Sequence, residues 1–149
     1  MKNILLIIIL TLISCKDHNV QTDVNNNQYV DNLNNGYAEL QAHNFTQAIK
    51  YFNDIIDNLT FSQSETLVAK SYLYRGLAKN DLGDERGAIS DFTMIINNSR
   101  VNDYIAEAYH FRGIAHLNMR NLDLACSDWS KSGELGINRS YKFIQENCN

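Results

Sequence analysis

The sequence predicts an all-helical protein, and three observations carry this prediction. Apolar residues recur at spacings of three and four through most of the chain, as on one face of a helix. Few segments alternate apolar and polar residues, and the 149 residues include no proline. With 44% hydrophobic and 20% charged residues, the chain has the composition of one globular domain.

The charges exclude one class of partner. Thirteen Lys and Arg residues stand against seventeen Asp and Glu residues, which gives a net charge of -4 with the two signs interspersed. A protein that binds nucleic acid needs a basic face to neutralise phosphates. We therefore expect no nucleic-acid partner.

Residues 1–14 have the features of a signal peptide. A lysine precedes the apolar run from Ile4 to Ile13, which is too short to cross a bilayer, for which about 20 residues are needed. The run ends in Leu-Ile-Ser-Cys, and this ending resembles the bacterial lipobox. The resemblance implies that Cys15 is acylated and becomes the new N-terminus; the alternative is an ordinary secretory signal with an incidental cysteine.

Residues 15–26 are predicted to form a flexible tether, because they are polar and rich in Asn. Several acyl chains on Cys15 would hold the protein firmly on a membrane. Lys16 and Asp17 resemble the start of outer-membrane or surface lipoproteins of some Gram-negative groups. We expect a lipid-anchored protein of the bacterial cell envelope, in the periplasmic or surface leaflet of the outer membrane.

A repeated pattern organises the rest of the chain. Residues 74–92 read YRGLAKNDLGDERGAISDF, residues 111–129 read FRGIAHLNMRNLDLACSDW, and residues 35–52 are a weaker copy. Each copy has a glycine, an alanine twelve residues later and an aromatic residue four further on. These are Gly36, Ala48 and Phe52; Gly76, Ala88 and Phe92; and Gly113, Ala125 and Trp129. The pattern resembles the tetratricopeptide repeat.

The resemblance implies a short right-handed solenoid in a domain spanning 27–149. Three helix-turn-helix repeats would cover about 29–62, 69–102 and 106–137, and a capping helix would cover 138–148. The copies are 40 and 37 residues apart, where the family has 34, and each lacks the closing proline, so we expect long connections between repeats. The second helix of each repeat is expected to begin at an N-cap, namely Asn44, Asp84 or Asn121. Gln47 is expected to form a capping box with Asn44. The first helices are expected to end at a residue in the left-handed conformation, namely His43, Gly83 or Arg120.

Two arginines have an aspartate sixteen residues later. Arg75 precedes Asp91, Arg112 precedes Asp128, and the first copy has neither residue type at these positions. Because the arginine and the aspartate occur together, we interpret them as ion pairs between the two helices of a repeat. The alternative is an anion-binding arginine.

No catalytic or metal-binding motif is present in the sequence. His110 and His116 are six residues apart and do not share a helix face as an i, i+4 metal pair would. The chain has no phosphate-binding glycine loop and no Gly-x-Ser-x-Gly elbow. We expect neither a cofactor nor a metal, and no enzymatic activity.

Tetratricopeptide repeats usually bind their partners on the concave face formed by the first helices. Carried over by position, the resemblance places twelve candidate peptide-binding residues there. They are Leu33, Tyr37, Leu40, Lys70, Leu73, Leu77, Asn80, Asp81, Glu107, His110, Ile114 and Leu117. The resemblance therefore implies a protein or peptide partner and a role as an interaction module or scaffold. The alternative is a purely structural envelope lipoprotein; a small-molecule, anion-binding or enzymatic role is less favoured.

The C-terminal segment is predicted to dock on the open end of the array. Tyr141, Ile144 and Cys148 fall at i, i+3 and i+7 and would form one apolar stripe. Docking would bring Cys148 towards Cys126, and a disulfide is possible in the oxidising cell envelope. Two buried free cysteines are the alternative.

Overall fold

The computed structural model describes residues 27–148, which form helices joined by turns and loops and contain no strand. A first helix runs through residues 27–41. It is followed by α2 (Phe45–Asn58), α3 (Glu65–Asp81), α4 (Glu85–Asn98), α5 (Asn102–Asn118), α6 (Leu122–Glu134) and α7 (Arg139–Asn147). The prediction of an all-helical fold is confirmed. The signal peptide at 1–14, Cys15 and the tether at 15–26 lie outside the described residues.

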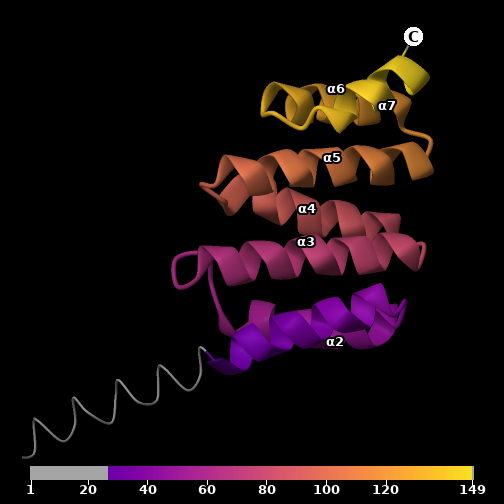
Figure 1. Ribbon diagram of the computed structural model, residues 1–149. Helices are drawn as coiled ribbons and strands as arrows, with labels where there is room; N and C mark the ends of the chain where they lie inside the picture. The colour runs from indigo at the N-terminus through magenta and orange to yellow at the C-terminus, as the bar shows by residue number, and fades with distance from the viewer. Residues whose placement is uncertain (1–26, 149) are drawn as a thin grey trace, which may run out of the picture.

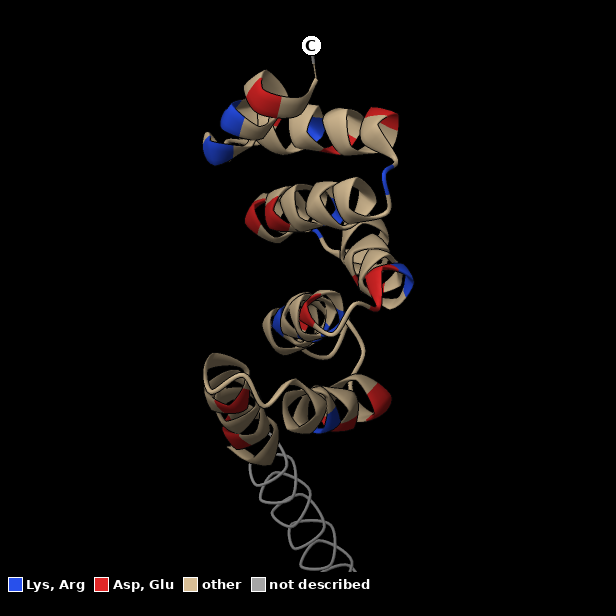
Figure 2. Cartoon of the chain, turned by 90° about the vertical axis from the view of Figure 1, so that its right-hand side faces the viewer, with Lys and Arg blue, Asp and Glu red and all other residues tan. Residues whose placement is uncertain are grey.

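The helices form successive hairpins that stack in chain order. From α2 to α7, each helix packs against the next one, and α3 also contacts α5. Figure 1 shows the helices rising in sequence from α2 to α6 and α7. Seen from the side in Figure 2, they alternate between two layers, and acidic and basic positions are interspersed on the side in view.

The turns within the three hairpins have one shared geometry. His43, Gly83 and Arg120 adopt φ values of 60°, 80° and 62°, which is the left-handed conformation that often ends a helix. The next residue's amide then donates back to a carbonyl five residues earlier, for example from Asp84 to Lys79 over 2.8 Å. The predicted stops are therefore present in all three turns, although only one of them is a glycine.

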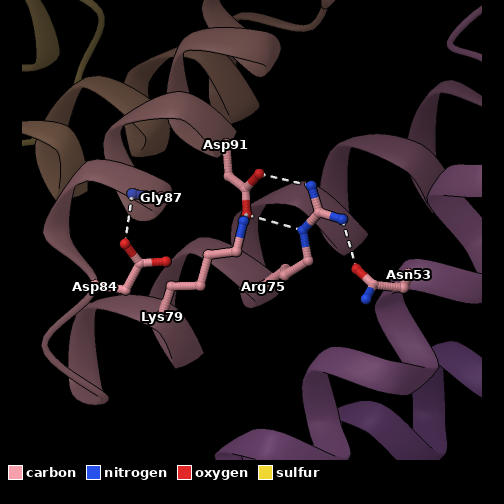
Figure 3. A network of polar contacts seen from close by, with 6 residues as sticks. All are labelled: Asn53, Arg75, Lys79, Asp84, Gly87 and Asp91. Carbon is pink, nitrogen blue, oxygen red and sulfur yellow. Dashed lines mark hydrogen bonds and ion pairs between the residues drawn. The ribbon is translucent and has the colours of Figure 1, made fainter.

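The predicted side-chain caps are only partly right. Asp84 accepts a hydrogen bond from the backbone N–H of Gly87 (Figure 3). Asn44 makes no such bond; its amide Nδ2 instead donates to Glu39 Oε2 at 2.8 Å, a bond strengthened by the carboxylate charge. The capping box of Asn44 and Gln47 is thus wrong, and Asn121 also makes no side-chain cap bond.

Small residues let the helices of each hairpin approach closely. A Cβ atom added to Gly36, Gly76 or Gly113 would lie 2.6 Å from an aromatic ring. These rings belong to Phe52, Phe92 and Trp129, which are completely buried. The glycine and the aromatic residue of each copy are therefore in contact, and no side chain larger than hydrogen fits between them.

Candidate functional site

Arg75 joins three helices (Figure 3). Its Nε and Nη2 donate to the two carboxylate oxygens of Asp91 on α4, at 2.9 and 2.7 Å. Its Nη1 donates to Asn53 Oδ1 on α2 at 2.6 Å. Lys79 Nζ lies 2.9 Å from Asp91 Oδ2 and adds a second cation to this carboxylate, which is almost fully buried.

Arg112 makes the equivalent contacts one hairpin later. It donates to both carboxylate oxygens of Asp128 on α6 at 2.8 Å, and to Thr93 Oγ1 on α4 at 3.0 Å. The hydrogen bonds that Arg112 donates to Asp128 raise the pKa of its guanidinium. Both ion pairs expected from the sequence are present in the structure, but the bonds to the preceding hairpin were not anticipated.

The first copy has no equivalent ion pair. Asn35 and Tyr51 occupy the equivalent positions there, and no described hairpin precedes this copy. The arginines are only 14% and 19% exposed, and each binds an aspartate on one edge and the preceding hairpin on the other. This geometry favours a packing role over an anion-binding role.

Four of the proposed concave-face residues belong to the core instead. Leu33, Leu73 and His110 occupy equivalent positions in the three copies and are 8%, 8% and 2% exposed. Leu40 is also 8% exposed. The prediction that these four residues contact a partner is wrong. The first helices of successive hairpins lie side by side, as the direct contact of α3 with α5 shows, and these side chains are buried between the helices.

α7 occupies a further part of the expected face. Arg139 at its start forms an ion pair with Glu107 and lies 5.5 Å from the ring centroid of Phe111. The Nδ1 of His110 lies 2.8 Å from Ser140 Oγ. Burial lowers the pKa of His110 to about 4. In the third copy, Glu107 and His110 therefore contact α7.

The candidate residues that remain open form what we call the concave surface: Tyr37, Lys70, Leu77, Asn80, Asp81, Ile114 and Leu117. Tyr37 is 44% exposed, and its ring centroid lies 5.0 Å from that of Tyr74 on α3. Asn118 donates to Asn80 Oδ1 at 3.1 Å and links α5 to α3. The concave surface thus offers apolar and aromatic contacts with a few amide and charged groups, as a peptide-binding surface does.

A groove lined by none of the concave-surface residues was not anticipated from the sequence. It has a volume of about 750 Å³ and lies among α2, α3 and α4. Six apolar and five polar residues line it: Ile56, Leu59, Phe61, Val68, Tyr72 and Met94, with Thr60, Ser62, Glu65, Asn98 and Arg100. Residues 59–64, the long connection implied by the 40-residue spacing, supply one wall, where Phe61 stacks on Tyr72 with centroids 5.9 Å apart.

Glu65 holds the second long connection in place. One of its carboxylate oxygens accepts bonds from Ser99 Oγ and from the backbone N–H groups of Arg100 and Val101. The hydrogen bond from the Arg100 amide lowers the pKa of Glu65. A side chain at the start of α3 therefore orders the loop between α4 and α5.

The C-terminal helix is fixed by a disulfide and a buried polar chain. Cys126 on α6 is bonded to Cys148, with Cα atoms 5.8 Å apart. The predicted stripe is only partly right, because Tyr141 is 47% exposed. Instead, the ring of Phe143 packs between His110 and Trp129, at centroid distances of 5.2 and 5.0 Å. Phe143 was missed because it lies outside the i, i+3, i+7 pattern that includes Cys148.

Within residues 27–148, no group of three or more His, Cys, Asp or Glu residues is placed to hold a metal ion. None of the helices in that same range has the length and apolar character needed to cross a membrane. Comparison with protein-family models and with curated proteins gives no match to this chain.

Proposed function

We propose that this chain is a lipid-anchored tetratricopeptide-repeat protein of the bacterial cell envelope that binds another protein and has no catalytic role. The observation that carries the repeat assignment is the contact between a glycine and an aromatic residue at equivalent positions of three successive hairpins: Gly36 with Phe52, Gly76 with Phe92, and Gly113 with Trp129. The family's packing requires small residues at this crossing. Stacking of the first helices in one layer supports a short solenoid.

The concave surface supports the binding role. Tyr37 is exposed on the first helix and leads to the half-buried Leu77 and Ile114 on α3 and α5. A continuous surface across three helices can take a peptide or a partner helix. The ion pairs of Arg75 and Arg112 lie within the packing of the hairpins, so they hold this surface in register without occupying it.

Crosslinking in native membranes tests the binding role. The wild-type protein is compared with the variant Tyr37→Glu/Asp81→Arg, which changes two exposed residues of the concave surface. The control is Leu82→Glu/Leu124→Glu, since both leucines are 52% exposed, Leu82 directly after α3 and Leu124 in the first turn of α6. We expect one defined crosslinked partner for the wild type and the control, and its loss in the concave variant. A partner captured equally by all three would place binding elsewhere, and no partner at all would favour the purely structural role.

The membrane anchor has its own test. Labelled palmitate is expected to enter the wild-type protein and to be absent from Cys15→Ala, which should accumulate as an uncleaved precursor. Normal processing of the Cys15→Ala protein would contradict lipidation at this residue and favour an ordinary secretory signal.

A further inference from the structure

The end of the array is closed by α7, a helix with little packing of its own. It has nine residues, of which only Ser140 is fully buried. Helices shorter than about 12 to 15 residues are marginal in water without tertiary contacts. The contacts that hold α7 to the rest of the chain therefore decide whether it is present as a helix on this surface.

These contacts fall into two groups at opposite ends of α7. At its start, Ser140 Oγ donates to Ser132 Oγ on α6 at 2.8 Å and meets His110 on α5. At its end, Cys148 forms the bond to Cys126. Between them, the ring of Phe143 covers Trp129, the only tryptophan of the chain.

Cys126 and Cys148 are both only partly buried. Buried structural disulfides are shielded from exchange, whereas accessible ones are the labile class. Cys148 lies one residue from the end of the chain. The disulfide is therefore the covalent contact between the C-terminal end of α7 and α6 among the described residues.

We propose that the Cys126–Cys148 disulfide is a redox latch that keeps α7 docked, and that its reduction releases α7 and uncovers the surface that Phe143 covers on His110 and Trp129. A dithiol reductant supplies the chemistry. One of its thiolates attacks a cysteine sulfur and forms a mixed disulfide, which its second thiol resolves. Two electrons and two protons pass to Cys126 and Cys148, and the dithiol becomes a disulfide. The latch is independent of the protein-binding role proposed above.

Trp129 reports directly on this step. Its side chain is 0% exposed, and its Nε1 donates to the backbone carbonyl of His110 at 3.2 Å. Departure of Phe143 would open the face of the indole to water while that hydrogen bond holds the indole on α5. Tryptophan fluorescence and its quenching by acrylamide therefore follow the docking of α7 without a label.

The experiment uses the full-length protein in detergent, oxidised or treated with dithiothreitol, with mass spectrometry of alkylated thiols to verify reduction. We expect reduction to increase acrylamide quenching of Trp129 severalfold and to accelerate amide hydrogen exchange of residues 139–147 at least about tenfold, while the first helix to α6 keep their protection. Unchanged quenching and exchange would overturn the latch. Loss of protection throughout the domain would also overturn the proposal, because the disulfide would then stabilise the whole fold and not the docking of α7 alone.

Two variants complete the test. Cys126→Ser/Cys148→Ser is expected to behave like the reduced protein in both conditions, and dithiothreitol should cause no further change in it. If Trp129 stays protected in this variant, docking does not depend on the bond and the proposal is wrong. Phe143→Ala in the oxidised protein is the positive control for the signal, since it opens the indole face while the disulfide remains.

Discussion

Arg75 donates a hydrogen bond from Nη1 to Oδ1 of Asn53, 2.6 Å away, and so connects α3 to the second helix of the hairpin before it. The same arginine holds Asp91 within its own hairpin. Arg112 repeats both contacts with Thr93 and Asp128. Each arginine therefore fixes the packing within one hairpin and its position on the previous one.

The pair of Arg112 and Asp128 should show strong coupling in a double-mutant cycle. Arg112→Leu leaves the Asp128 carboxylate, which is 5% exposed, without its bidentate partner. We expect a loss of about 3 kcal/mol in the free energy of unfolding. The double change with Asp128→Leu should cost less than Arg112→Leu alone, as measured by denaturant unfolding. Additive effects would show that the two residues act independently.

Arg75→Leu should be less harmful than Arg112→Leu. In the first of these proteins Asp91 keeps Lys79, whose Nζ is 2.9 Å away. The position equivalent to Lys79 is His116, whose Nε2 lies 3.8 Å from Asp128 and whose pKa is lowered by burial, so it is neutral at pH 7. Adding Lys79→Met to Arg75→Leu should bring its stability down to that of Arg112→Leu. Equal losses for the two single variants would contradict a role for Lys79.

Stability should fall in mild acid because of His110. Its pKa is about 4 in the folded protein, against 6.5 for an ordinary histidine. The unfolded chain therefore binds more protons between these values, and this stabilisation is present above pH 6.5 and lost as the pH falls towards 4. Over this pH range, protonation of His110 should lower the free energy of unfolding by on the order of 3 kcal/mol. His110→Gln should have a shallower dependence of the unfolding free energy on pH over this range, and an unchanged slope would show that other groups cause it.

Gly76→Ala should destabilise the protein despite the better helix propensity of alanine. The new Cβ would lie 2.6 Å from Phe92 Cε1, and such overpacking costs about 1 to 3 kcal/mol. Thermal melting measures the loss. Phe92→Leu in the same protein should recover part of it by providing space, whereas a further loss in the double variant would exclude a clash with this ring.

Glu65→Ala should expose the loop after α4 to trypsin. The bond that trypsin would cut joins Arg100 to Val101, and the Val101 amide donates to Glu65 at 3.2 Å. Without the carboxylate, this segment should be cleaved several times faster, as followed by mass spectrometry at a fixed time. Thr66→Ala is the matched control because Thr66 is exposed on the same turn. Equal cleavage of the two variants would show that Glu65 does not hold the loop.

The sequence was sufficient for elements that depend on local pattern. The three turns and the ion pairs of Arg75 and Arg112 follow from residues that recur at equivalent positions of the repeated pattern. For Cys126 and Cys148, the sequence predicted docking of the last helix but left a disulfide and two free thiols as alternatives. The burial of His110 and Leu73 could not be predicted from the local pattern, because it depends on how closely the first helices of successive hairpins pack against one another. The groove beside Phe61 was missed for a similar reason: the 40-residue spacing indicates a long connection but not the direction it takes.

Packing of each helix on the next one determines how the chain can fold. Most contacts join segments that are close in sequence, and such a low contact order is typical of rapid folding. The site for α7 is complete only after α5 and α6 have paired, because it uses His110 from one and Ser132 from the other. Cys148 then reaches Cys126 as a late event, so oxidation of this pair would record that the preceding hairpin had already assembled.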